Sequence, residues 1–404
     1  MVYNNSHIEG VITLKLEEIK ELDKKYFMNT FGERTPVAFE RGEGMYLYST
    51  EGEKYLDMFA GIAVSSLGHN HKTYTAALHA QVDKLIHTSC LYYVENQARL
   101  AEKIVKSSCA DKVYFSNSGA EANEAAIKLA KIYFYKKGIE KYEVISLHSS
   151  FHGRTLATVA ATGQEKYQKP YKPLIPGFKQ VTINDFDALS EAVTDKTCAI
   201  ILEPIQGESG VHIVDSEYLK KVRALCDEKE IILIFDEIQT GIGRCGKMYC
   251  YQTTPVEPDI FTLAKGLAGG VPIGAVCAKE FVADAFAPGD HGGTFGGNPL
   301  ATGAGLAVFC AIEEENLCEN AEKMGQYIED KINEKLSEKV TDIRRRGLMI
   351  GIDVASDAAE ARKKLFEKHV LVGSVGAHTL RVLPPLIISK KEADEFVEAL
   401  AEIL

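Results

Sequence analysis

Two residues in the middle of the chain, Asp236 and Lys265, have the types and the setting for chemistry on a bound aromatic ring. Asp236 follows the apolar run 231–235, and Lys265 comes just after the apolar run 260–263. A carboxylate beside a ring nitrogen keeps the ring cationic and electron-withdrawing, and a lysine in apolar surroundings can form an imine with a ring aldehyde. A single lysine is usually a surface charge, but Lys265 lies in an otherwise apolar stretch. Together the two residues predict a cofactor site.

Polar residues also follow three earlier apolar runs, 113–115, 144–147 and 199–202. Runs this short, separated by helical stretches, are typical of strands buried on both faces of a mostly parallel sheet. Ligands of such sheets bind outside the carboxyl ends of the strands. We therefore expect the residues after all five runs to converge. The residues concerned include Ser118, Gly119, Phe151, Arg154, Glu203, Glu208, Asp236 and Lys265.

The residues after the first run predict an anion site. Ser118 and Glu121 have the spacing of a capping box at the start of a helix. The small residues Gly119 and Ala120 would let backbone N–H groups approach a phosphate, and the helix dipole would add attraction. A phosphate-binding helix, a carboxylate for a ring nitrogen and an imine-forming lysine are together the requirements of pyridoxal 5'-phosphate.

A nucleotide site is the main alternative for the acidic strand end. Residues 241–247 fit the pattern G-x-x-x-x-G-K, but Met248 stands where the hydroxyl that binds Mg²⁺ belongs. The segment also follows no apolar strand. The sequence therefore disfavours an ATPase.

Composition and charge exclude several other classes of protein. The 404 residues are 46% hydrophobic and 25% charged, with 46 basic and 57 acidic residues and a net charge of −11. These values are typical of a globular chain, and the negative charge disfavours nucleic acid or anionic lipid as a partner. The one basic tract, Arg344 to Arg346, is more typical of a solvated corner than of a nucleic-acid patch.

The cysteines, the histidines and the N-terminus indicate a cytoplasmic protein without a bound metal. Nine scattered cysteines form no C-x-x-C pair, which is typical of reduced thiols. The stretch from Met1 to Glu21 has no apolar core for a signal peptide, and no run is long enough to span a membrane. His69 and His71 have no cluster of carboxylates or cysteines nearby, so we assign them and the remaining histidines structural roles.

The order of elements predicts an α/β fold with two parts. We expect an N-terminal segment, residues 1–70, that joins a small domain and contains a helix and short strands. Residues 71–301 would form a large cofactor-binding domain around the mostly parallel sheet. Residues 302–404 would form a smaller C-terminal α+β domain with apolar segments at 348–354 and 380–388.

With these motifs in order, the chain resembles the class III (ornithine-type) aminotransferases of the fold-type I pyridoxal-phosphate enzymes. The resemblance covers nearly the whole chain, from Arg34 to Leu386. The segments that carry it are 117–124, 151–155, 203–208, 236–241, 262–266 and 294–300.

The resemblance implies a role for each matching position. Lys265 and Asp236 would be the catalytic residues, and Lys265 would move the proton between cofactor and substrate. The cofactor would be held by Ser118, Gly119, Ala120, Phe151, Asp236, Glu237, Ile238, Gln239 and Lys265, with Thr294 reaching the phosphate of a neighbouring subunit in a homodimer. Substrate would be held by Arg154, Glu208, Gly293 and Arg381, with Arg381 taking the α-carboxylate of glutamate and Glu208 pairing with Arg381 when no such carboxylate is bound.

The activity implied is transfer of the δ-amino group of N2-acetyl-L-ornithine to 2-oxoglutarate, giving L-glutamate, by a ping-pong cycle in arginine biosynthesis. Gly293 stands where family members that act on this substrate usually have serine, and Lys72 replaces a usual proline. Ile62 stands where enzymes for free ornithine have tyrosine. Succinylornithine, 4-aminobutyrate and lysine-type aminotransfer stay open as alternatives. An aminomutase is a further alternative, and so is a non-catalytic regulator. A regulator would normally carry a DNA-binding segment, and the first 35 residues are too few and too acidic for one.

Overall fold

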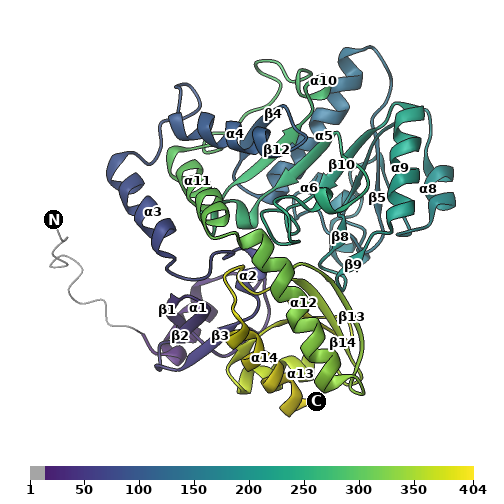
Figure 1. Cartoon of the computed structure of the whole chain (residues 1–404). Coiled ribbons are helices and arrows are strands. Elements are labelled where there is room, and N and C mark those ends of the chain that lie inside the picture. The colour runs from purple at the N-terminus through teal and green to yellow at the C-terminus, as the bar shows by residue number, and fades with distance from the viewer. Residues whose placement is uncertain (1–13) are drawn as a thin grey trace.

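A seven-stranded sheet forms the centre of the larger part of the molecule (Figure 1). The computed structural model describes residues 14–404, so residues 1–13 of the expected N-terminal segment lie outside the described residues. β12 is antiparallel to both of its neighbours, and the other neighbouring pairs are parallel. In spatial order the strands are β4 (Lys112–Ser116), β12 (Gly274–Ala278), β11 (Ile260–Leu263), β10 (Ile232–Asp236), β7 (Thr197–Leu202), β5 (Glu143–Leu147) and β6 (Phe178–Val181).

The mostly parallel sheet predicted from the sequence is confirmed, and all five apolar runs are strands of it. The sequence did not reveal β6 and β12. β6 reads Phe-Lys-Gln-Val at the edge of the sheet, and β12 reads Gly-Ala-Val-Cys-Ala, which is fully buried but built of small residues. Neither strand presents a run of large apolar side chains.

Successive side chains of the central strands pack into two separate cores, because neighbouring residues of a strand point to opposite faces. Ile232 and Ile234 pack with helix α5, whereas Leu233 and Phe235 pack in the core on the other face. The helices of this part are α3 (Lys72–Lys84), α4 (Glu95–Ser107), α5 (Gly119–Lys136), α6 (Leu156–Ala161), α7 (Glu165–Gln168), α8 (Phe186–Ala192), α9 (Ser216–Lys229), α10 (Glu280–Ala283) and α11 (Pro299–Glu314), with the 3-10 turns η1 (Lys169–Tyr171), η2 (Cys250–Thr253) and η3 (Lys265–Ala268).

The C-terminal part is a second, antiparallel sheet covered by helices. Its strands are ordered β13 (Val340–Arg346), β14 (Met349–Val354), β17 (Thr379–Val382) and β16 (Gly373–Val375). Its helices are α12 (Leu317–Leu336), α13 (Ala358–Glu367) and α14 (Lys390–Ile403). A two-stranded hairpin, β8 (Ile205–Gln206) and β9 (His212–Ile213), lies between the large sheet and β13 and β14 (Figure 1).

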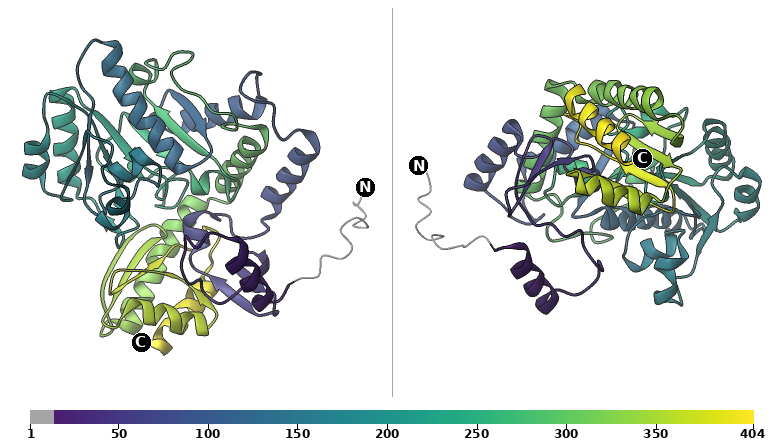
Figure 2. Two further views of the ribbon diagram at one scale, coloured as in Figure 1. Left: turned by 180° about the vertical axis from the view of Figure 1, so that it is seen from behind. Right: turned by 90° about the horizontal axis from the view of Figure 1, so that it is seen from below.

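The N-terminal segment pairs with the C-terminal part. β1 (Phe39–Glu43), β2 (Tyr46–Ser49) and β3 (Lys54–Asp57) form a sheet that ends in β15 (Val370–Leu371), parallel to β3. Helix α1 (Leu16–Tyr26) lies at the edge of the molecule and has no buried residue (Figure 2). The turn α2 (Ala60–Ala63) has positive φ at all four residues, a strained conformation for L-residues.

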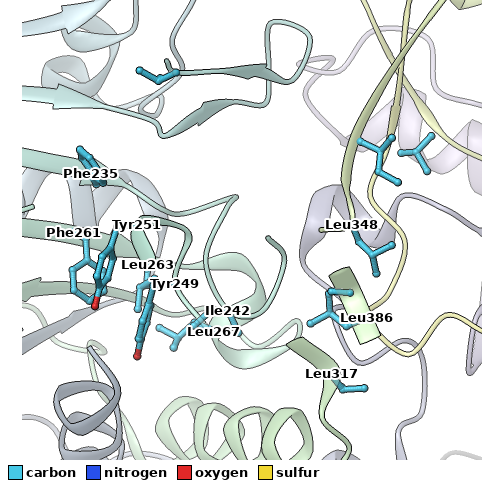
Figure 3. Packing of buried hydrophobic residues seen from close by; sticks show 14 of the residues in the cluster. Phe235, Ile242, Tyr249, Tyr251, Phe261, Leu263, Leu267, Leu317, Leu348 and Leu386 are labelled. Carbon is cyan, nitrogen blue, oxygen red and sulfur yellow. The ribbon is translucent and has the colours of Figure 1, made fainter. Parts of the chain in front are cut away.

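One hydrophobic core runs from the large sheet into the C-terminal part (Figure 3). Phe235 and Phe261 of the large sheet belong to the same cluster as Ile242, Leu348 and Leu386. Helix α11 contacts α3, α4 and η3 of the large part, and also α12 of the C-terminal part. The division at residues 70 and 301 stays a prediction, with α11 as the connection between the two parts.

Candidate active site

A cavity of 380 Å³ opens at the carboxyl ends of the parallel strands. Its size suits a small organic ligand. The residues that follow all five apolar runs line it, so the predicted convergence is observed. The lining residues predicted from the sequence are Ser118, Gly119, Ala120, Phe151, Arg154, Glu203, Glu208, Asp236, Ile238, Gln239 and Lys265.

The N-terminus of α5 forms one wall of the cavity. Ser118 caps this helix by accepting a hydrogen bond of 3.2 Å from the backbone N–H of Glu121. The reverse contact of the predicted capping box is absent, because the Glu121 carboxylate accepts from the backbone N–H of Asn117 at 2.7 Å instead. A Cβ on Gly119 would lie 2.8 Å from the Ile238 side chain. Glycine therefore permits the close approach of this backbone, and the first N–H groups of the helix have no partner within the helix.

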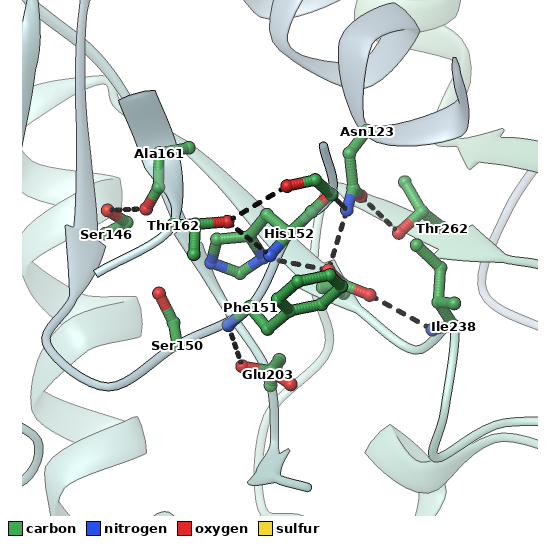
Figure 4. Close-up of polar contacts among 12 residues, drawn as sticks. Asn123, Ser146, Ser150, Phe151, His152, Ala161, Thr162, Glu203, Ile238 and Thr262 are labelled. Atoms are coloured by element: carbon green, nitrogen blue, oxygen red, sulfur yellow. Dashed lines mark hydrogen bonds and ion pairs between the residues drawn. The ribbon is translucent and has the colours of Figure 1, made fainter. Parts of the chain in front are cut away.

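Asp236 is buried at the end of β10. It is held by Asn123, His152 and Ile238, which Figure 4 labels. Its Oδ2 accepts hydrogen bonds from Nδ2 of Asn123 at 2.7 Å and from Nδ1 of His152 at 2.8 Å. Its Oδ1 accepts from the backbone N–H of Ile238 at 3.1 Å. Asn123 is itself oriented by Thr262, whose hydroxyl donates to it at 2.8 Å. These contacts fix the direction of the carboxylate.

Sequence reasoning missed both His152 and Asn123. We predicted a structural role for His152, but its fully buried ring touches the carboxylate of Asp236, and its Nε2 has no partner in the described residues. Asn123 lies four residues after Gly119 on α5 and was part of a matching segment without an assigned role. Only contact with Asp236 reveals what these two residues do. One signal was available in the sequence: Asn123 is a polar residue on the buried face of α5, the helix that begins at the cavity.

Glu203 adds a second buried acid to the cavity. Its Oε2 accepts from the backbone N–H of Phe151 at 3.0 Å. Burial, and next the charge of Asp236, raise the pKa of Glu203 well above its ordinary value. Both causes disfavour the charged form of the Glu203 carboxyl group.

Lys265 is the first residue of η3, just after β11, and has a φ of 46°, a strained angle for a residue other than glycine. Burial lowers the pKa of its amino group to about 8, although the nearby Glu208 acts in the opposite direction. A substantial fraction of the amine is thus neutral near pH 7 to 8, and only the neutral amine can act as a nucleophile or a base.

Arg381, which is buried, and Glu208, which is partly buried, form an ion pair beside Lys265. Nη1 of Arg381 donates to Oε1 of Glu208 at 2.6 Å and to the carbonyl of Gly207 at 3.1 Å. Although burial opposes it, Arg381 lowers the pKa of Glu208. Nε2 of Gln239 donates to the same Glu208 oxygen at 3.1 Å, so Gln239 connects this pair to the end of β10.

Phe151 and Arg154 lie at the other side of the cavity. The ring of Phe151 packs edge-on against Tyr167, with the centroids 5.7 Å apart. The guanidinium of Arg154 lies 3.8 Å from the Tyr167 centroid, a cation–π contact that the sequence did not reveal. Arg154 forms no ion pair with any residue of 14–404 and is exposed, so its charge is available to a ligand.

Glu237 does not line the cavity, so its predicted role in cofactor binding is wrong. Its carboxylate accepts from the backbone N–H groups of Cys250 at 2.5 Å and Tyr251 at 2.7 Å and thereby caps η2. Burial raises its pKa to about 8. The reason is the alternation of side chains at the end of a strand: Asp236 faces the cavity, so its neighbour points away.

Gly293 and Thr294 also lie outside the cavity of their own chain. Both are exposed on the loop that precedes α11. The Gly293 carbonyl accepts from the thiol of Cys90 at 3.8 Å. The predicted contacts of Gly293 with substrate and of Thr294 with a phosphate therefore stay predictions.

The two histidines near the N-terminus each contact a different carboxylate: Nε2 of His69 lies 2.8 Å from Oδ2 of Asp57, and Nε2 of His71 lies 2.9 Å from Oε1 of Glu315. Within residues 14–404, no group of three or more metal-ligating side chains has the geometry for an ion. The nine cysteines are free. In the same part of the chain, no helix combines the length and the hydropathy needed to cross a bilayer.

The cavity fits pyridoxal 5'-phosphate. The glycine-lined start of α5 provides N–H donors for a phosphate, the fixed carboxylate of Asp236 suits a protonated ring nitrogen, and Lys265 carries an amine of lowered pKa. The large parallel sheet with this residue set at its carboxyl edge defines an aminotransferase of fold-type I. The family model for class III aminotransferases matches residues 27–404. The chain belongs to the class III aminotransferases, which use pyridoxal 5'-phosphate.

Several relatives match most of the length of this chain. The acetylornithine aminotransferase of Methanocaldococcus jannaschii is 50% identical over 387 residues, which are 95% of this chain and 97% of the relative. The crystal structure of acetylornithine aminotransferase from Elizabethkingia anophelis matches with a TM-score of 0.86 and 32% identity over 97% of this chain and 99% of that one. The ornithine aminotransferase of Toxoplasma gondii matches with a TM-score of 0.92 and 31% identity, over 99% and 97% of the two chains.

Proposed function

We propose that this enzyme transfers the δ-amino group of N2-acetyl-L-ornithine to 2-oxoglutarate, giving N-acetyl-L-glutamate 5-semialdehyde and L-glutamate in arginine biosynthesis. The observation that carries the proposal is a pair of arginines of different character: Arg154 lines the cavity, whereas Arg381 does not line it and binds Glu208, which does. Arg381 is neutralised by Glu208, whereas Arg154 is exposed and has no ion pair within residues 14–404. The names of the relatives above support the choice of donor.

The two arginines explain how one cavity serves two substrates. A bidentate guanidinium suits a carboxylate better than an ammonium does. Arg154 would hold the carboxylate of acetylornithine, while Glu208 keeps the charge of Arg381 neutralised near the reacting end. When 2-oxoglutarate or glutamate enters, Glu208 would leave Arg381, which then binds the α-carboxylate. Since both substrates use the same cavity, they must bind in turn, which is a ping-pong cycle.

The remaining residues would position the cofactor and move a proton. Bound pyridoxal 5'-phosphate supplies an electron sink that stabilises negative charge at the reacting carbon. Ser118, Gly119 and Ala120 would hold its phosphate, Phe151 its ring face, and Ile238 and Gln239 its other edges. Asp236 would keep the ring nitrogen protonated, and the Nζ of Lys265 would take a proton from the substrate carbon and return it.

The absorbance near 420 nm of the purified holoenzyme tests the donor. We expect N2-acetylornithine to remove this band, and free ornithine or 4-aminobutyrate to do so far more slowly. 2-Oxoglutarate should restore the band. A holoenzyme that reacts with glutamate but not with acetylornithine would exclude the proposed donor, and succinylornithine would be examined next. The cysteine pattern fits a cytoplasmic enzyme, which we also propose.

We further propose that two copies of the chain share the site. Thr294 and Phe295 are exposed beside a segment with solvent-facing apolar side chains. Leu91 is 86% exposed, and Tyr93 is fully exposed. Clustered apolar side chains of this kind are typical of an interface. A second copy seated there would bring its own Thr294 to this cavity, as the family resemblance implies.

Replacing Tyr93 with aspartate tests the shared site. Burying an unpaired charge at an interface weakens association by several kcal/mol, so we expect at least an about hundredfold weaker dimer. Sedimentation should show monomers, and cofactor affinity should fall with dissociation. Tyr135, 80% exposed on α5, provides the matched control, and Tyr135→Asp should leave the dimer intact. A Tyr93→Asp variant that stays dimeric would place the interface elsewhere.

A further inference from the structure

The basic tract Arg344 to Arg346 is not the solvated corner that the sequence predicted. It lies in β13, and each arginine contacts a different element. Arg345 pairs with Glu329 at 2.6 Å and Glu322 at 3.0 Å on α12. Arg346 donates to the carbonyl of Thr253 in η2 at 3.1 Å. Arg344 contacts the hairpin that carries Glu208.

Arg344 and Arg381 are aligned across the small sheet. Arg344 of β13 is opposite Gly351 of β14, and Gly351 is opposite Arg381 of β17. Residues directly opposite on neighbouring strands share a face of the sheet. The two arginines therefore flank Gly351 on one face, and the loop 207–211 between β8 and β9 lies over this row.

Both arginines hold the same loop by its backbone. Arg381 donates to the carbonyl of Gly207 at 3.1 Å, and Arg344 donates to the carbonyl of Gly210 from Nη2 at 2.9 Å and from Nε at 3.2 Å. Glu208 lies between these two anchor points. The position of the loop therefore limits how far the Glu208 carboxylate can move away from Arg381.

Gly351 allows the loop 207–211 to lie close to the sheet. A Cβ at this position would lie 2.9 Å from the Cβ of Val211 and 3.0 Å from the Gly210 carbonyl oxygen. Val211 is fully buried with a φ of 59°, an unfavourable angle for a β-branched residue. Such a conformation persists only where its surroundings hold it.

Arg344 is itself rigidly placed. Nη1 and Nη2 each donate to an oxygen of Asp353 at 2.7 Å, and the Thr379 hydroxyl donates to the same carboxylate at 2.6 Å. The hydrogen bonds from Arg344 lower the pKa of Asp353. Lysine has three donors and no planar fork, so it cannot replace the four hydrogen bonds that Arg344 makes to Asp353 and Gly210.

We infer that Arg344 is a positioning residue for the Glu208–Arg381 pair and thereby sets how the site divides between its two substrates. By holding Gly210, Arg344 keeps Glu208 against Arg381. A loop without this anchor leaves Arg381 unshielded, which favours glutamate and 2-oxoglutarate over a donor that presents no carboxylate there. The inference rests on the proposed function, because it concerns the same alternation of Arg381 between partners.

The test compares two neighbouring arginines of one strand in the holoenzyme. Arg344→Gln removes the contact with the loop, and Arg345→Gln is the matched control, since Arg345 is equally enclosed but contacts only α12. The half-reactions with acetylornithine and with glutamate are measured separately by the loss of absorbance near 420 nm. Hydrogen exchange of the backbone amides of 205–214 is measured in parallel.

For Arg344→Gln we expect the efficiency with acetylornithine to fall about tenfold, as for one lost charge-assisted hydrogen bond, while that with glutamate changes less than about threefold. Amides of 205–214 should exchange faster. Arg345→Gln should leave both the ratio and these amides unchanged. Equal losses in both half-reactions, or the same ratio change in Arg345→Gln, would overturn the inference and reduce Arg344 to a structural role.

Two further variants keep the test decisive if Arg344→Gln does not fold. Arg344→Lys retains the charge and should change the ratio in the same direction. Gly351→Ala lifts the loop from the sheet without altering either arginine and should do likewise, whereas an unchanged ratio in both would overturn the inference. A wild-type holoenzyme that reacts with glutamate but not with acetylornithine refutes the proposed donor alone. The same comparison is then made with the ω-amino donor that it accepts.

Discussion

Replacing Lys265 with alanine is expected to lower the rate of amino transfer by about 10³- to 10⁴-fold, the upper part of the range for a positioned proton-transfer group. In the cavity Lys265 is the amine whose pKa burial has lowered to about 8. Neither Arg381 nor Arg154 can replace it, because a guanidinium stays protonated. The phosphate and ring contacts are made by other residues, so the variant should still bind the cofactor noncovalently.

The rate is measured with saturating cofactor, and cofactor binding is measured by its absorbance and by equilibrium dialysis. Lys247→Ala is the control, since Lys247 is exposed and has no proposed role in the reaction. A Lys265→Ala enzyme that keeps a tenth of the wild-type rate would show that another group moves the proton. A variant that no longer binds the cofactor at all would instead assign Lys265 mainly to binding.

The lowered pKa of Lys265 has a consequence for pH. In the cofactor-free chain the amine is protonated below about pH 8 and neutral above it. Attachment of the cofactor needs the neutral amine, so its rate should rise with pH and level off above about pH 8, whereas an ordinary lysine would titrate near 10.4. Glu208 raises this pKa, and Glu208→Gln should therefore move the midpoint to lower pH. An unchanged midpoint would exclude that coupling.

Replacing Asp236 with asparagine is expected to lower the rate by about 10²- to 10³-fold, the size of a lost preorganised electrostatic contact. Asparagine keeps the shape but has one acceptor oxygen, so it can retain either the bond from Ile238 or the bonds from Asn123 and His152, and it removes the charge. The ring nitrogen of the cofactor would then lose the group that favours its protonated form.

Asp236→Glu, which keeps the charge, provides the comparison and should retain more activity. Steady-state rates and the pH dependence of the cofactor absorbance are measured for both variants. The unfolding temperature shows whether the network around His152 survives. An asparagine variant with near wild-type rates and an unchanged absorbance profile would show that the charge of Asp236 is not used.

The position of the cavity could be predicted from the sequence, because short apolar runs identify buried strands and the carboxyl ends of parallel strands meet at one edge. For this reason the sequence alone assigns to one site four residues that are far apart in the chain, Phe151, Glu208, Asp236 and Lys265. β6 and β12 were missed, since a short edge strand and a strand of small residues have no distinct pattern. The direction of a side chain at the end of a strand was harder still to predict. Glu237 was assigned to the cofactor, but its side chain points away from the cavity.

By itself the sequence determined the class of fold, the cofactor and the segments that line its cavity, because these depend on residue types in local segments. Only the tertiary structure decided that His152 and Asn123 hold Asp236, and that Thr294 lies outside its own cavity. It also decided that Arg344, Gly351 and Arg381 align beneath the loop of Glu208. The physical reason is that strand register and hairpin docking depend on contacts between segments distant in sequence. The local periodicity of the sequence does not indicate these contacts.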